Sequence, residues 1–285
     1  MEQRILGATG ARLSVVGFGG IVVMDETPAD AARFVAEAID RGVNYFDVAP
    51  TYGNAQDMLG PALEPFRRNV FLACKTTKRT AADAAAELEN SLRVLRTDHV
   101  DLYQMHAMKT QAEVARVLGP GGALEAFVRA REAGKVRFLG FSAHSEEAAL
   151  ALMAGFRFDS VLFPFNWGAW FANGFGKRVL ADARARGMGV LALKALARRR
   201  WADDEPRPWP KCWYAPSESP AEAALALRFT LGLGVTAAVS PSHAGLFRWM
   251  CAAAANTAPL SAAEESELAR AARDLAPVFP EPTPH

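Results

Sequence analysis

The stretch VNYFDVAPTYGNAQDML, residues 43–59, joins an apolar run to two polar groups that such a run does not need. The run ends in Asp47, and Tyr52 follows five positions later in a loop that contains Pro, Gly and Asn. One interpretation is structural, with an acid capping a strand end and a tyrosine covering a turn. The other interpretation is an active site. The choice depends on how often this pattern of buried strand and polar loop recurs.

Short apolar runs of this kind recur along the chain, with helical segments between them. They comprise residues 14–20, 43–48, 70–75, 100–106, 136–142, 160–166, 189–195 and 235–240. Strands without polar alternation are expected where both faces of a parallel sheet are covered. Eight strands alternating with helices predict an α/β fold, a parallel (β/α)8 TIM barrel. A doubly wound open sheet is the alternative, but no G-x-G-x-x-G motif follows the first run.

The predicted barrel accounts for the whole chain, residues 1–285, as one domain. Residues 4–12, RILGATGAR, predict a β-hairpin that plugs the barrel floor. Residues 196–219 form a long loop after the seventh strand, and its aromatic residues argue against disorder. Residues 276–285 form a Pro-rich tail, which we expect on the surface.

Composition narrows the class of protein further. The chain is 51% hydrophobic and 22% charged. Its net charge of +1 does not indicate the positively charged surface that would attract nucleic acid or an anionic membrane. No signal-peptide core and no membrane-spanning apolar run is present in the sequence. Cys74, Cys212 and Cys251 are widely spaced and form no C-x-x-C motif, which indicates reduced thiols. We therefore expect a cytoplasmic monomer with neither nucleic-acid nor membrane partners.

Polar residues gather at the ends of the predicted strands, where a (β/α)8 barrel places its active site. These residues are Asp47, Lys75, His106, Ser142 and Lys194. Lys75 is the most informative, because lysine is rarely buried without a partner and an unpaired buried charge is costly. Asp47 on the adjacent strand is the natural partner. Their pair could simply join two strands, or it could serve acid–base chemistry.

Acid–base chemistry explains these groups together with the tyrosine. A free tyrosine has a pKa near 10 and exchanges protons poorly at neutral pH. An ammonium at Lys75 would lower the pKa of Tyr52, while Asp47 keeps that ammonium charged and oriented. Tyr52 could then donate a proton to a carbonyl oxygen or accept one from an alcohol. A neutral His106 could hydrogen-bond to the same oxygen.

Five segments in order resemble the aldo-keto reductase superfamily over nearly the full length of the chain. They are RILGATGARLSVVGFGG (4–20), GVNYFDVAPTYGNAQDMLG (42–60), VFLACKT (70–76), DHVDLYQMHA (98–107) and GKVRFLGFSAHS (134–145). The resemblance implies hydride transfer from NADPH, or from NADH, to an aldehyde or ketone. It makes Tyr52 the general acid, supported by Lys75 and Asp47, with His106 orienting the substrate carbonyl.

The resemblance also implies a cofactor site, which this sequence matches less closely. The cofactor-binding candidates are Ser142 for the nicotinamide amide, Lys194 for a phosphate, and Ser242 and Arg248 for a 2′-phosphate. Leu162 stands near the family's glutamine, and Leu193 stands near an aromatic residue that stacks on nicotinamide. We expect NADP(H), with NAD(H) as the alternative.

The substrate pocket is predicted from aromatic residues near the strand ends. The candidates are Trp167, Trp170, Trp201 and Trp213, each of which could instead pack the long loop against the barrel. Aromatic walls with few charges suit an apolar or aromatic carbonyl compound as the small-molecule substrate.

Three other functions remain as alternatives. A metal-dependent hydrolase could use His106, His144 and His243, but the sequence has no H-x-H or H-E-x-x-H motif, and we expect no metal. A Schiff-base aldolase on Lys75 would leave Tyr52 unexplained. A catalytically silent reductase-like barrel could bind a nucleotide and regulate another process.

Overall fold

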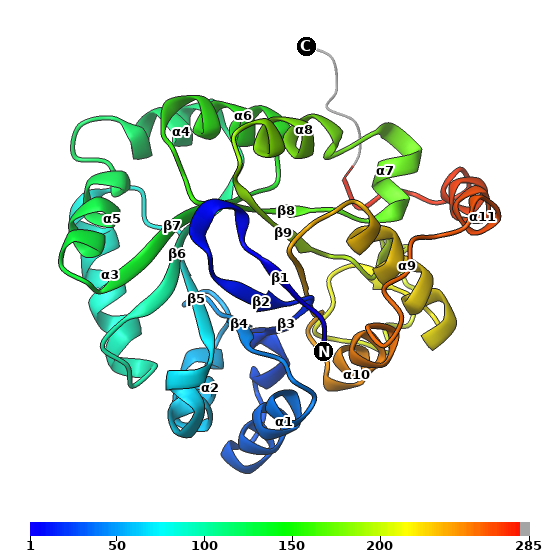
Figure 1. The fold of residues 1–285 in the computed structure, drawn as a ribbon, viewed down its shortest axis with the longest axis horizontal. Helices are drawn as coiled ribbons and strands as arrows, with labels where there is room; N and C mark the ends of the chain where they lie inside the picture. Colours follow the sequence, from blue (N-terminus) through cyan, green and yellow to red (C-terminus); the bar gives the residue numbers. More distant parts are fainter. Residues whose placement is uncertain (280–285) are drawn as a thin grey trace.

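The computed structural model describes residues 1–279 of the chain, and within them eight strands close into a barrel. The strand order is β12-β3-β4-β5-β6-β7-β8-β9, and every neighbouring pair is parallel (Figure 1). The strands are β3 (Val16–Gly19), β4 (Tyr45–Asp47), β5 (Phe71–Thr76), β6 (Val100–Met108), β7 (Val136–Ala143), β8 (Ser160–Pro164), β9 (Gly189–Leu193) and β12 (Ala237–Val239). The predicted parallel (β/α)8 barrel is confirmed, and each strand lies within or overlaps its predicted run.

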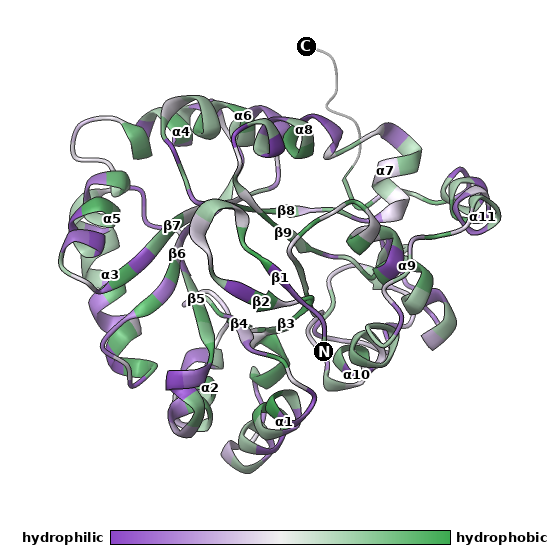
Figure 2. Ribbon diagram, in the orientation of Figure 1, coloured by the Kyte–Doolittle hydropathy of each residue, from purple (hydrophilic) through white to green (hydrophobic). Residues whose placement is uncertain are grey.

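Helices surround the barrel because each has an apolar stripe to bury. They are α1 (Pro28–Asp40), α2 (Ala55–Leu63), α3 (Ala81–Val94), α4 (Gln111–Leu118), α5 (Ala123–Glu132), α6 (Glu146–Gly155), α7 (Trp167–Asn173), α8 (Lys177–Ala185), α9 (Pro220–Gly232), α10 (Ala244–Ala253) and α11 (Ala262–Ala272). In α1 the buried residues Ala31, Phe34, Val35 and Ala38 follow the spacing of a helix face. Helices in Figure 2 accordingly carry both hydrophilic and hydrophobic residues. None of the helices in the described part of the chain is long and apolar enough to cross a membrane.

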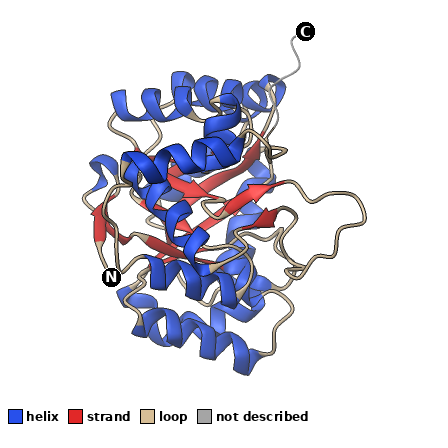
Figure 3. Ribbon diagram, turned by 90° about the vertical axis from the view of Figure 1, so that its right-hand side faces the viewer, coloured by secondary structure: helices blue, strands red, loops and turns tan. Residues whose placement is uncertain are grey.

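The N-terminal hairpin closes one end of the barrel. Its strands β1 (Gln3–Ile5) and β2 (Arg12–Ser14) are antiparallel and lie across the barrel axis in Figure 1. Leu6 and Leu13 pack into the apolar cluster inside the barrel. Gly189 is required at the contact, because a Cβ there would lie 2.3 Å from the Leu6 side chain. The predicted floor plug is therefore present, and the opposite end of the barrel carries the long loops (Figure 3).

The long loop after β9 is ordered by its own pairing. Strand β10 (Ala197–Arg199) pairs with β11 (Ala215–Pro216), so the two ends of the loop meet. Lys211 connects the loop to the segment between β3 and α1 through a 2.6 Å contact with Glu26. These contacts hold the loop over the C-terminal ends of the strands.

The C-terminal tail was expected on the surface, and its described part departs from that expectation. The Arg200 N–H donates to the Ala276 carbonyl oxygen at 3.0 Å, and Val278 is buried. Phe279 stacks on Phe175 with ring centroids 4.9 Å apart. Apolar side chains at these positions explain the docking, which brings the tail to the same end of the barrel as the long loop. Residues 280–285 of the predicted tail lie outside the described residues.

Candidate active site

Three barrel strands carry polar side chains to one end of the barrel. Asp47 is the last residue of β4, Lys75 lies near the end of β5, and His106 lies near the end of β6. Tyr52 stands in the loop after β4, where its N–H donates to the Ala49 carbonyl oxygen at 3.1 Å. Parallel pairing brings these elements together, because all their carboxyl ends point the same way.

Lys75 connects the acid to the phenol. Its ammonium forms a buried ion pair with Asp47 and lies 3.2 Å from the Tyr52 hydroxyl. Gln104 and Tyr45 donate to the other carboxylate oxygen at 3.2 and 3.3 Å. These hydrogen bonds satisfy the buried carboxylate, so Asp47 is anchored on one side and holds Lys75 on the other.

The electrostatics of this group favour a charged lysine and a neutral phenol. Burial would lower the pKa of Lys75, but Asp47 and Tyr52 outweigh it and hold that pKa above its usual value. Burial raises the pKa of Tyr52, and the opposing effect of Lys75 is smaller. Lys75 lowers the pKa of Tyr52 as expected, but burial outweighs this effect, so the net shift is upward, opposite to the lowered pKa that the sequence predicted. The phenol keeps its proton at neutral pH.

His106 faces Tyr52 as an uncharged imidazole. Their ring centroids are 5.7 Å apart, in an edge-to-face arrangement. Burial, followed by the charge of Lys75, lowers the pKa of His106 to about 2. Ser142 lies beside this histidine, with its Oγ 3.5 Å from Nδ1 and accepting a 2.9 Å hydrogen bond from the Ala107 N–H. The arrangement offers a neutral proton donor and a neutral hydrogen-bonding group to one ligand atom.

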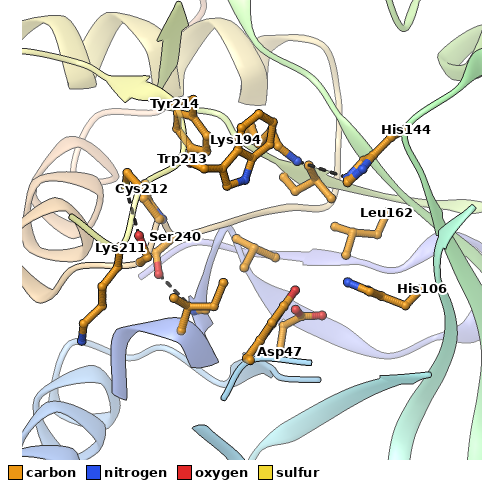
Figure 4. Close-up of a pocket in the computed structure, with 17 residues that line it drawn as sticks. Asp47, His106, His144, Leu162, Lys194, Lys211, Cys212, Trp213, Tyr214 and Ser240 are labelled. Carbon is orange, nitrogen blue, oxygen red and sulfur yellow. Dashed lines mark hydrogen bonds between the residues drawn. The ribbon is translucent and has the colours of Figure 1, made fainter. Parts of the chain in front are cut away.

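A pocket with a volume of about 180 Å³ opens above these groups (Figure 4). Its lining includes Tyr52, His106, His144, Lys194, Trp213 and Ser242. The lining combines strand ends of β4, β6, β7 and β9 with the loop 196–219 and the loop after β12. Catalytic candidates and loop residues thus share one cavity.

The predicted cofactor residues divide into two groups. Lys194 and Ser242 line the pocket, and the Ser242 hydroxyl lies 3.0 Å from the Cys212 sulfur. Ser142 is buried beside His106 and is not part of the pocket lining. Arg248 projects from α10 to Glu37 of α1, with contacts between 2.8 and 3.1 Å. The guanidinium of Arg248 is thus occupied by a carboxylate outside the pocket.

The predicted substrate residues divide in the same way. Trp213 lines the pocket, whereas Trp167 is buried in the core and Trp170 packs against Phe229 with ring centroids 6.0 Å apart. Trp201 donates from its indole N–H to the Cys212 carbonyl oxygen at 2.8 Å. For these three tryptophans the structure shows packing of barrel and loop, the alternative that the sequence left open.

Sequence reasoning missed two polar residues of the site. Gln104 stands two positions before His106 on β6, so both side chains lie on the same face of the strand. That alternation was a usable signal. His144 follows β7 directly and lines the pocket, and it was considered only as a metal ligand. Within residues 1–279, no group of three or more His, Cys, Asp and Glu side chains could hold a metal ion.

A closed parallel barrel thus carries a buried Asp–Lys pair, a tyrosine and an uncharged histidine at the C-terminal ends of its strands. This arrangement is suited to proton transfer. The model of the aldo/keto reductase family matches residues 16–214. That match covers most of the chain, so the chain belongs to the aldo/keto reductase family.

Individual relatives agree with this assignment. The aldo-keto reductase YhdN of Bacillus subtilis is 27% identical over 223 residues, which cover 70% of this chain and 63% of that protein. The 6-dehydroglucose reductase of Novosphingobium aromaticivorans is 33% identical over 172 residues, 52% of this chain and 54% of the relative. The chain thus spans between half and two-thirds of the length of these two relatives.

Solved structures support the fold. The aldo-keto reductase AKR11C1 of Bacillus halodurans, in its holo form, superposes with a TM-score of 0.76 at 23% identity. The superposition covers 97% of this chain and 98% of the other.

Proposed function

We propose that the protein is an NAD(P)H-dependent oxidoreductase that reduces an aldehyde or ketone, or oxidises the corresponding alcohol, with Tyr52 as general acid or base. The observation that carries the proposal is the contact between the Lys75 ammonium and the Tyr52 hydroxyl, at 3.2 Å. Membership of the aldo/keto reductase family supports the reaction class.

Each residue of the site has a separate task in this proposal. Tyr52, which is neutral at rest, donates its proton to the carbonyl oxygen. The Lys75 ammonium stabilises the phenolate that results, and Asp47 keeps the ammonium in place. His106 hydrogen-bonds to the same oxygen as a neutral imidazole and directs the carbonyl toward Tyr52. In the reverse direction the phenolate accepts the proton of the alcohol.

The residues at one end of the pocket fit a nucleotide phosphate. Ser240 and Ser242 line this end, and α10 begins just beyond them without a side-chain cap from His243. Free N–H groups at a helix start favour anions. Leu162 and Leu193, by contrast, offer no polar group to a carboxamide. We expect NADP(H), with NAD(H) as the alternative, and the bound cofactor would supply or accept the hydride.

Cofactor titration tests the proposal first. Trp213 lines the pocket, so NADPH and then NADH should quench tryptophan fluorescence saturably. A panel of aldehydes and ketones should then be reduced by the wild type and not by Tyr52→Phe, while both bind the cofactor equally. If neither NADPH nor NADH bound at millimolar concentration, the proposed reductase function would be wrong. Binding without turnover on a broad panel would favour the catalytically silent barrel.

The proposal includes a cellular setting, inferred from the sequence. We propose a cytoplasmic monomer that acts on a small molecule and binds neither nucleic acid nor membranes. The net charge of +1 and the three free cysteines support this setting. Light scattering on the purified protein would test the monomer.

A further inference from the structure

Lys194 is a buried lysine that the reaction proposed above does not use. It lies directly after β9, lines the catalytic pocket and is only 9% exposed. No carboxylate among residues 1–279 forms a salt bridge with it; Asp47 lines the same pocket but is paired with Lys75. A buried cation without a counter-charge is costly, so its presence needs an explanation.

The groups around the Lys194 amine hold it without neutralising it. The Nζ atom lies 3.2 Å from Nε2 of His144, which can accept its hydrogen bond. The rings of Trp213 and Phe279 lie with their centroids 5.1 and 5.2 Å from Nζ. Imidazole and aromatic faces stabilise an ammonium but bring no negative charge. Burial and, to a lesser degree, the charge of Lys75 lower the pKa of Lys194 to about 7.

The backbone at Lys194 is also unusual. Its φ angle of 62° lies in the left-handed region, which disfavours residues with a side chain. Such strain persists where the surroundings impose it, and it gathers at ligand sites. This conformation places the lysine in the catalytic pocket, where its amine meets His144.

The direction of the amine separates it from the phosphate end of the pocket. In Figure 4 the Lys194 amine points to His144, while Ser240 and Cys212 lie on the other side of the cavity. Lys194 lines the same pocket as Tyr52 and His106, the groups at the reacting end. Leu162 and Leu193 form an apolar wall of the same pocket.

We propose that Lys194, oriented by His144, binds a carboxylate of the substrate, so that the pocket takes carbonyl compounds in which an apolar spacer joins the carbonyl to an acid. This inference rests on the proposed reductase function and names its substrate class. It replaces the neutral apolar substrate that the sequence suggested, while the aromatic and apolar walls remain suited to the spacer. It also moves Lys194 from the predicted cofactor phosphate to the substrate.

Matched substrates test the proposal. We would compare kcat/KM for 4-carboxybenzaldehyde and for its neutral isostere 4-formylbenzamide in the wild type, Lys194→Met and Lys177→Met. The Lys177→Met control makes the same charge change on the exposed face of α8. The wild type and the control should prefer the acid. Lys194→Met should lose at least tenfold of that preference, mainly through KM, because the ammonium acts in binding.

Two further measurements on the same variants separate the possible failures. If Lys194→Met weakens NADPH binding and leaves the acid preference unchanged, Lys194 serves the cofactor and the proposal is wrong. If no variant reduces any carbonyl, the reductase function fails, and calorimetric titration of the cofactor-free protein with 4-carboxybenzaldehyde and 4-formylbenzamide decides the inference. Binding of the acid that Lys194→Met abolishes would support a carboxylate site. Equal binding of acid and amide would overturn it.

Discussion

Two buried lysines stand at the same mouth of the barrel and have opposite surroundings. Lys75 has a carboxylate partner in Asp47, and its pKa is held above the usual value despite burial. Lys194 has an imidazole and two aromatic rings, and burial lowers its pKa to about 7. From this difference we infer that Lys75, which has a carboxylate partner within the protein, stays positively charged at all times. A cation without such a partner is suited to a charge that arrives with a ligand.

The largest effect is expected at the phenol beside Lys75. Tyr52→Phe removes the proton donor but leaves the ring, so kcat should fall by about 10²- to 10⁴-fold. Cofactor affinity and the unfolding midpoint should stay close to wild type, because the change removes only a hydroxyl from a partly buried ring. Steady-state kinetics with a neutral aldehyde would measure the effect. Wild-type turnover in Tyr52→Phe would remove the basis for assigning proton transfer to the group formed by Asp47, Lys75 and Tyr52, here called the Lys75 corner.

The two lysines should differ in their contribution to stability. Lys75→Met leaves the buried carboxylate of Asp47 unpaired and should cost about 3–5 kcal/mol in the free energy of unfolding. Lys194→Met removes an uncompensated cation and should leave that free energy unchanged or raise it. Urea unfolding of both variants at neutral pH would measure the difference. Equal destabilisation would mean that Lys194 has a counter-charge in the folded protein.

Between about pH 7 and 10.5, stability should depend on pH through Lys194, whereas the raised pKa of Lys75 affects stability only above that window. The folded-state pKa of Lys194 is about 7 and the usual pKa of lysine is 10.5, so the unfolded chain binds more protons between these values. Stability therefore rises with pH across that window, and the penalty is fully present below it. The difference between wild type and Lys194→Met isolates this contribution. A difference that stays constant from about pH 7 upward would contradict the lowered pKa.

The Lys75 corner could be predicted from the sequence, because its parts lie at the ends of consecutive strands. Strand periodicity placed Asp47 and Lys75 side by side, and the parallel register supports that placement. The sign of the Tyr52 pKa shift could not be predicted, because it depends on how deeply the loop buries the phenol. Pairing of neighbouring strands is local information, whereas depth of burial is a property of the whole fold.

The surroundings of Lys194 could be predicted only in part: Lys194 and Trp213 were expected at the pocket, but the contacts of Lys194 with His144 and Phe279 join distant segments. His144 lies 50 positions from Lys194, and Phe279 arrives with the C-terminal tail. Arg248 failed as a pocket residue for the same reason, since its partner Glu37 lies 211 positions away on a helix. A long side chain pairs with whichever group the fold brings near it, and the periodicity of the sequence does not reveal that group.

The smallest effect is expected at the tail that covers Lys194. Phe279→Ala removes one of the two rings beside the amine and should admit water, which weakens the desolvation that lowers the pKa of Lys194. Binding of 4-carboxybenzaldehyde should then persist to higher pH, with a midpoint raised by up to about one pH unit. Calorimetric titration of the acid across pH would measure this midpoint.

Phe156→Ala is the matched control, because this ring is also partly buried but packs on Phe158 outside the pocket. If both variants shift the midpoint equally, general loosening of the barrel explains the shift. If only Phe279→Ala shifts it, the tail sets the charge of Lys194 and thereby the pH range in which the pocket prefers an acid.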